Sequence, residues 1–296
     1  MLITVLISVA AAVSYGVSDF LGAVGARRLR VLPGTAITYL FAFAALSVAL
    51  LVVGGEWSPS ALFWGTAAGV AAIAGFLAFY AALAAGPMSL ASPLIAVVGS
   101  AVPVLIAVVL GDRLPPLAWA AVGIALVGGL AISITRRGDA SGIPRKTVVL
   151  AILAGALLGL SIAALDRTPV EAGLVPAFVE ILVGLALLAV LLVAVRVSRT
   201  VRRWLSILDE EQGGPQPSRA RARAVSAGAG VLLGAANALI LLGLQSGSLA
   251  VVSVLVGLYP VATIVLAGLV YRERLTTVQL GGVALALVAS VLLALA

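Results

Sequence analysis

The sequence predicts an all-α membrane protein in which ten helices cross the bilayer as two inverted five-helix repeats. Composition is the first observation behind this prediction: 63% of the 296 residues are hydrophobic and only 10% are charged. Soluble domains average about 25% charged residues, and a soluble chain this apolar would lack polar residues to cover its surface. The second observation is a series of long apolar runs, and the third is an internal repeat.

The apolar runs predict membrane helices. A helix needs about 20 mainly apolar residues to cross the hydrocarbon core of a bilayer. The runs are continuous and rich in Ala and Leu, without the period-two alternation of membrane strands. The ten predicted spans are residues 2–24, 34–53, 61–84, 88–110, 116–134, 147–165, 171–195, 224–245, 249–270 and 276–295.

The repeat appears when the sequence is shifted by 161 residues. Residues 86–127 then align with 247–288 without a gap, and 13 of the 42 aligned positions are identical. The alternative interpretation is convergent low complexity in an Ala/Val/Leu-rich chain. Matches at polar and turn positions pair Ser92 with Ser253, GDRL (111–114) with RERL (272–275) and, more weakly, GVS (16–18) with GLS (159–161).

Five spans per half is an odd number, so the second half enters the membrane upside down relative to the first. Inverted repeats of this kind place the substrate site of secondary transporters near the bilayer midplane. We expect a first repeat over residues 1–135, a basic linker over 136–146 and a second repeat over 147–296. The second repeat contains a polar loop at 197–223, interpreted either as a solvated linker or, in its first part, as a basic helix on the membrane surface.

One stretch carries a family resemblance. LYPVATIVLAGLVYRERL (258–275) places Pro260 ahead of an apolar run and a Glu-Arg-Leu turn that begins at Glu273. With this stretch and ten spans in two halves, the chain resembles the EamA family of the drug/metabolite transporter superfamily. The first half departs from the pattern, because Gly99 replaces the Pro and Asp112 replaces the Glu. The resemblance implies helices around a central cavity and a carrier of small metabolites, often an exporter.

Charge in the loops predicts the orientation. Cytoplasmic loops carry an excess of Lys and Arg, and 16 of the 18 basic residues fall in loops on one side of the predicted membrane. Only Arg113 and Arg167 fall on the other side. We therefore expect a plasma (inner) membrane protein with both termini outside the cytoplasm, although relatives are thought to keep both termini inside. The net charge of +7 is explained by this bias rather than by a nucleic-acid partner.

Two acids lie well inside predicted spans. A charge at the bilayer centre costs at least about 2.5–3.5 kcal/mol, so Asp19 and Glu180 are candidates for a substrate or proton site. Tyr15 lies four residues before Asp19 and shares its helix face, and Ser18 is adjacent. The alternatives are a structural hydrogen bond, or a position close enough to the interface to stay hydrated.

Further polar residues extend this predicted site. Asn237, Tyr80 and Tyr259 are expected to line the path, with helix–helix hydrogen bonding, packing or interfacial placement as the alternatives. Pro103 and Pro260 are expected to kink the fourth and ninth spans, since proline removes a backbone donor. A gating hinge and a fixed bend are both compatible with such a kink.

The predicted function is secondary active transport of a small metabolite or drug-like solute by alternating access, with a proton-coupled exporter as the version to test. The alternative is a non-transporting membrane scaffold or sensor. With neither His nor Cys in the chain, we expect no enzyme, no metal site and no cofactor. The expected partners are a small solute, protons and the lipid bilayer, but not nucleic acid, and the chain is expected to act as a monomer or homodimer.

Overall fold

The computed structural model describes residues 2–29, 31–85, 88–111, 114–133, 145–205, 218–271 and 277–295, and the regular structure in these ranges is helical throughout. The helices are α1 (Leu2–Leu29), α2 (Val31–Val53), α3 (Pro59–Ala85), α4 (Met88–Val109), α5 (Pro116–Ser133), α6 (Arg145–Asp166), the 3-10 turn η1 (Val170–Ala172), α7 (Val175–Val197), α8 (Arg199–Leu205), α9 (Arg219–Ser246), α10 (Leu249–Val256), α11 (Tyr259–Tyr271) and α12 (Thr277–Leu295).

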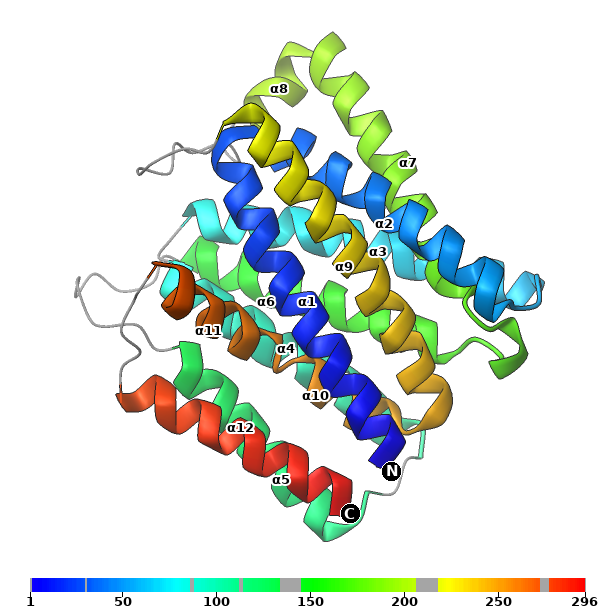
Figure 1. Cartoon of the computed structure of the whole chain (residues 1–296), viewed down its shortest axis with the longest axis vertical. Coiled ribbons are helices and arrows are strands. Elements are labelled where there is room, and N and C mark those ends of the chain that lie inside the picture. The colour runs from blue at the N-terminus through cyan, green and yellow to red at the C-terminus, as the bar shows by residue number, and fades with distance from the viewer. Residues whose placement is uncertain are drawn as a thin grey trace.

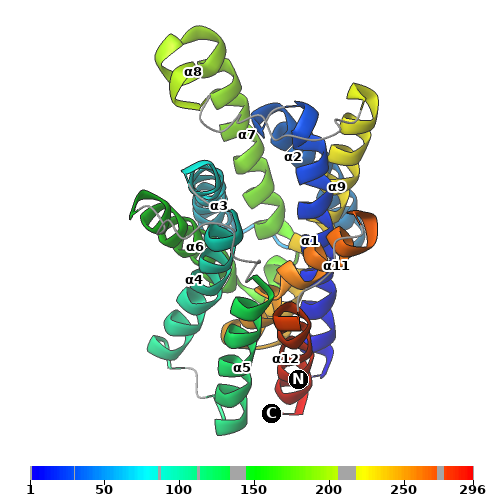
Figure 2. The same ribbon diagram turned by 90° about the vertical axis from the view of Figure 1, so that its left-hand side faces the viewer.

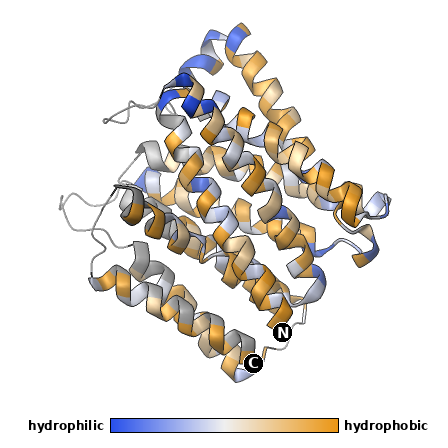
Figure 3. Ribbon diagram, viewed as in Figure 1, coloured by the Kyte–Doolittle hydropathy of each residue, from blue (hydrophilic) through white to orange (hydrophobic). Residues whose placement is uncertain are grey.

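The helices have the length and apolar composition of membrane spans. Within the described ranges six of them, α1, α2, α3, α6, α7 and α9, contain segments long and apolar enough to cross a bilayer on their own. Shorter apolar segments occupy Ile95–Val109, Pro116–Gly128 and Leu249–Thr263. Figure 3 shows hydrophobic residues along the helices and hydrophilic residues gathered around α8. The all-helical prediction is confirmed, and a total of ten spans stays a prediction.

The helices form two groups that mix the sequence halves. In one group α1 packs along α9 and against α11, and in the other α6 packs along α3 and α4. Figure 1 shows α1 and α9 side by side, and Figure 2 separates the two groups, with α2 and α7 near one end and α5 paired with α12 near the other. The two halves therefore interlock, and a two-repeat architecture fits this exchange of partners.

Equivalent glycines lie at close helix crossings in both groups. A Cβ on Gly16 would collide with the carbonyl oxygen of Tyr259, where α1 crosses α11. A Cβ on Gly159 would lie 2.8 Å from the carbonyl oxygen of Gly99, where α6 crosses α4. Small residues let membrane helices approach this closely. Since Gly16 and Gly159 occupy matching places in the GVS and GLS segments, the two crossings are related as the repeat predicts.

The ninth predicted span is a broken helix. The sequence predicts one run over 249–270, whereas the structure ends α10 at Val256 and starts α11 at Tyr259. Pro260 has no N–H for the carbonyl of Val256, and its ring crowds that carbonyl. The chain turns through a bond from the Leu258 N–H to the Leu255 oxygen at 3.1 Å.

The polar segment after α7 is partly helical. Residues 199–205 form α8, and α9 begins at Arg219, inside the predicted polar loop 197–223. Arg202 explains the turn between α7 and α8, because its guanidinium donates to the carbonyl oxygens of Val195 at 3.1 Å and Arg196 at 3.2 Å. A basic side chain satisfies the unpaired carbonyls at a helix C-terminus in this way.

Several sequence predictions fall outside the described residues. One is the basic linker 136–146, except for its last two residues, which begin α6. The others are the 206–217 part of the polar loop and the acid–Arg pairs of GDRL and RERL at 112–113 and 273–274.

Two turns from different halves interlock near the start of α7, at the opposite end of that helix from α8. The N–H of Glu56 donates to the Glu171 oxygen at 2.9 Å, and the N–H of Leu174 donates to the Gly54 oxygen at 3.2 Å. Gly54 and Gly173 have φ values of 79° and 51°, which favour glycine. We call this hydrogen-bonded pair of turns, residues 54–56 and 171–174, the turn seal.

Candidate functional site

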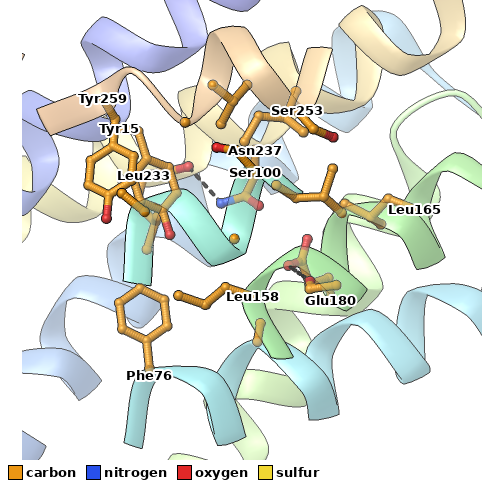
Figure 4. A pocket seen from close by; sticks show the side chains of 18 of the residues that line it. Tyr15, Phe76, Ser100, Leu158, Leu165, Glu180, Leu233, Asn237, Ser253 and Tyr259 are labelled. Atoms are coloured by element: carbon orange, nitrogen blue, oxygen red, sulfur yellow. Dashed lines mark hydrogen bonds between the residues drawn. The ribbon is translucent and has the colours of Figure 1, made fainter. Parts of the chain in front are cut away.

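A cavity lies between the two helix groups. Its empty volume is about 780 Å3, which includes open solvent at its mouth. Figure 4 shows Glu180 facing into it, with the Tyr15 and Tyr259 rings on the opposite side in this view. The lining residues whose chemistry matters come each from a different helix and are Tyr15, Tyr39, Phe76, Glu180, Asn237 and Tyr259.

Glu180 is the acidic group of this cavity. It lies in the second turn of α7, and its side chain is only 6% exposed. The Ser161 hydroxyl donates to Oε1 at 3.0 Å. The other oxygen, Oε2, is buried and has no hydrogen-bond partner among the described residues. A buried carboxylate with a free oxygen is costly unless a proton or a cation accompanies it.

Aromatic rings form much of the remaining wall. The rings of Tyr15 and Tyr259 pack with their centroids 5.3 Å apart, and Tyr39 meets Phe76 edge-on at 6.3 Å. Tyr39 and Phe76 also line the space next to Asp19. The aromatic cluster therefore connects the surroundings of the two acids that the sequence analysis selected.

Asp19 and Ser18 belong to a neighbouring cavity. This second space, of about 460 Å3, is lined by both residues and shares Tyr39, Phe76 and Leu233 with the first. Ser18 also donates to the Ala229 oxygen at 2.8 Å, which ties α1 to α9. The structure thus places Tyr15 and Asp19 on one stretch of α1 but in adjoining cavities.

The other predicted site residues have distinct surroundings. Asn237 is buried in the first cavity, and its amide donates to the Leu233 oxygen one turn earlier at 3.0 Å. Tyr80 lies in α3, but its side chain is outside what the structure describes. Pro103 is buried within α4, and Pro260 is the second residue of α11. Whether these residues contact a solute or move a helix stays a prediction.

Some lining residues were missed by the sequence analysis. Tyr39 and Phe76 are single aromatics in apolar spans, and nothing in their spacing distinguishes them from packing residues. Ser161 could have been found, because it occupies the place of Ser18 in the weaker repeat match. Ser253 belongs to the stronger match with Ser92, and it is buried in the cavity with a hydroxyl that has no partner in the described part of the chain.

The described part of the chain contains no group of three or more acidic residues placed to hold a metal ion. What the cavity offers is one buried carboxylate, hydroxyl and amide groups, and aromatic faces. Such groups can bind and orient a small molecule or a proton.

Comparison with known proteins identifies the family. The EamA-like transporter family matches twice, over residues 2–134 and 145–295. No curated protein matches the chain. A solved structure described as "Crystal structure of protein" shares the fold, with a TM-score of 0.69 at 22% identity, covering 98% of this chain and 95% of that one. Since the two family matches together span nearly all of the sequence, the chain belongs to the EamA-like transporter family of the drug/metabolite transporter superfamily.

Proposed function

We propose that this membrane transporter is a secondary active exporter that carries a small solute by alternating access and exchanges it for protons. The observation that carries the proposal is Glu180: a carboxyl buried between two helix groups, with one oxygen unpartnered among the described residues and a cavity in front of it. An intramembrane acid of this kind is a functional residue by default. The chain has no phosphate-binding P-loop motif, so we assign the driving energy to ion and solute gradients.

The moving units we propose are the two helix groups rather than the two sequence repeats. The repeats, with boundaries proposed at 1–135 and 147–296, exchange partners: α11 packs on α1, and α4 packs on α6. A rotation of whole repeats would break the glycine crossings at Gly16 and Gly159. Rotation of one group against the other preserves both crossings, while the contacts around the cavity and in the turn seal change.

The turn seal is the proposed gate on the side with few basic residues. It joins the turn after α2 to the turn before α7 through backbone hydrogen bonds. Gln245, at the end of α9, ties that helix to the same place by donating its amide to the Gly173 oxygen at 2.8 Å. These bonds are few, and Glu56 and Glu171 are exposed although Leu174 is buried. A small number of bonds at a partly exposed turn keeps the cost of local opening low. We propose that, with the seal closed, the cavities open toward the side of α8 and its arginines, and that this side is cytoplasmic.

Locking the seal will stop transport. The chain has no Cys, and the Glu56 N–H to Glu171 oxygen bond at 2.9 Å brings these backbones within the range that a disulfide spans. In an E56C/E171C variant we expect oxidation to lower solute flux at least about tenfold, because the two turns can no longer separate, and reduction to restore it. Each single variant is the control, and a membrane-impermeant maleimide should label E56C only from outside the cell.

Full activity of the oxidised pair would show that the seal need not open and would remove it as a gate. We propose that both termini face away from the cytoplasm in the inner membrane. Labelling of E56C only from the cytoplasm would show that the orientation is the opposite. We propose that one chain transports as a monomer, because the cavity is lined within a single chain. Flux of the reduced E56C/E171C protein at high lipid dilution, where each vesicle holds at most one chain, tests this proposal.

Alternating access has a test that needs no knowledge of the solute. Ser253 lines the cavity and is 1% exposed, so S253C introduces a single thiol at the centre of a chain without others. We expect a small membrane-impermeant thiol reagent to modify it from either side of the membrane. Modification from one side only, under every condition tried, would favour the scaffold or sensor alternative over a transporter.

A further inference from the structure

We propose that the cavity selects monovalent organic cations with a small aromatic or apolar body, and rejects amino acids and other carboxylate-bearing solutes. This inference rests on the proposed transport function and names the class of solute. It is carried by the unpartnered Glu180 oxygen together with the charge and the aromatic lining of the space around it.

The cavity offers negative charge without a basic counterpart. Glu180 faces the first cavity and Asp19 the second, and none of the described residues that line either space is Lys or Arg. The other titratable groups in the lining of the first cavity are phenols, those of Tyr15, Tyr39 and Tyr259. A cation that enters therefore replaces the proton on Glu180 as the partner of its carboxylate, and a proton leaves for each cation bound.

The broken helix adds to this preference for cations. A helix N-terminus ordinarily attracts anions through its free N–H groups, and α11 begins beside the cavity. Its second residue, Pro260, has no N–H, and the Val261 N–H already donates to the Leu258 oxygen at 3.0 Å. Pro260 also leaves Val256, a lining residue, without the donor that a continuous helix would supply to its carbonyl. The missing N–H of Pro260 and the bonded N–H of Val261 thus weaken the usual attraction of a helix start for anions.

The aromatic walls suit the body of such a cation. Tyr15 and Tyr259 form a packed pair with centroids 5.3 Å apart, and Tyr39 and Phe76 form a second pair. Ring faces attract a cation that lies within about 6 Å of their centroids and also stack on an aromatic solute. Positive charge and ring are therefore recognised by different walls, the charge by Glu180 and the ring by the tyrosines.

The same cavity disfavours a zwitterion. An amino acid would bring its carboxylate into an apolar space that already holds Glu180, with no described basic side chain in the lining to pair with it. Burying a charge without a partner is strongly unfavourable. The amine formed by removing the carboxylate from an aromatic amino acid keeps the ring and the ammonium group. It does not bury an unpaired carboxylate.

Four small probes separate these features: phenethylamine, phenylalanine, 3-phenylpropionate and 2-phenylethanol. They share a benzene ring and differ in carrying an ammonium, both charges, a carboxylate or neither. Equilibrium binding to the purified full-length protein in lipid nanodiscs should be at least about tenfold tighter for phenethylamine than for the other three, a difference that one unpaired buried charge readily exceeds. Binding should release protons, measured with a pH dye in weak buffer.

Variants locate the effect. E180Q should weaken phenethylamine binding at least about tenfold, because the cation loses its charged partner, and should remove the proton release. Thermal unfolding of E180Q checks its fold, which should hold because the introduced amide keeps an oxygen that accepts from the Ser161 hydroxyl. E210Q is the matched control: it changes an acid of the polar loop 197–223 that is not among the described residues lining either cavity, and it should leave binding and proton release unchanged. Phenylalanine or phenylpropionate binding as tightly as phenethylamine, or none of the four binding, would overturn the inference.

Neither of those results would bear on the proposed transport function. That function is judged by the access of S253C from both sides, which involves no solute. A chain whose cavity opens to both sides but binds phenylalanine is a transporter of another solute class. A chain that binds phenethylamine but whose cavity opens to one side only is a receptor.

Discussion

E180Q will lose the ability to accumulate phenethylamine against its gradient. In proteoliposomes with a pH gradient, we propose that accumulation by the parent protein depends on Glu180 carrying a proton in one direction and the cation in the other. Gln keeps the size and one acceptor oxygen for Ser161, which donates at 3.0 Å in the parent, but it exchanges no proton. We expect accumulation to fall at least about tenfold, with the pH dependence between roughly pH 5 and 8 lost.

D19N is the informative comparison for E180Q. Asp19 lies in the adjoining cavity and is only partly buried, so we propose that it attracts the cation on its way to Glu180 without completing the exchange. We expect D19N to slow uptake and to keep the pH dependence. Unchanged accumulation in E180Q together with its loss in D19N would move the coupling role to Asp19 and contradict our assignment.

Adding one methyl group at Gly16 will destabilise the protein, whereas the same change at Gly22 will not. A Cβ at Gly16 meets the Tyr259 carbonyl and lies 2.8 Å from the Ala262 Cβ, but a Cβ at Gly22 meets nothing within 4 Å. Overpacking of this kind costs about 1–3 kcal/mol, while Ala in an open helical position gains about 0.5–1 kcal/mol over Gly. Thermal unfolding in detergent compares G16A with G22A directly.

G159A provides the repeat-related counterpart. Its Cβ would lie 2.8 Å from the Gly99 oxygen and 2.9 Å from Pro103 Cδ, so the second crossing should lose stability by a similar amount. A stable G16A with a destabilised G22A would show that α1 and α11 do not cross this closely.

Most of the fold was open to prediction because membrane helices are specified locally. Without water, each backbone polar group must bond within its own segment, so length and hydropathy suffice to find spans such as α7. The break at Val256 was harder to place. Pro260 signalled a disturbance, but the sequence did not reveal that Gly257, in the break, packs against Ser100 of α4, where a Cβ would meet the Ser100 hydroxyl.

The site was predictable only in part. Glu180 stood out from the sequence because a charge in an apolar span is rare and costly. Its surroundings did not, since Tyr39 and Phe76 come from different helices and meet through packing that no sequence period encodes. The placement of Asp19 in an adjoining cavity has the same origin: Tyr15 and Asp19 share a helix face, but the rings around them divide the space.

The most direct test of the central claim is a structure of the purified protein with phenethylamine bound. Our account predicts its density in the cavity between the helix groups, with the ammonium at the free Oε2 of Glu180 and the ring against Tyr15 and Tyr259. Density elsewhere, such as among the helix ends near α8, with the central cavity unoccupied at saturating amine, would contradict the account.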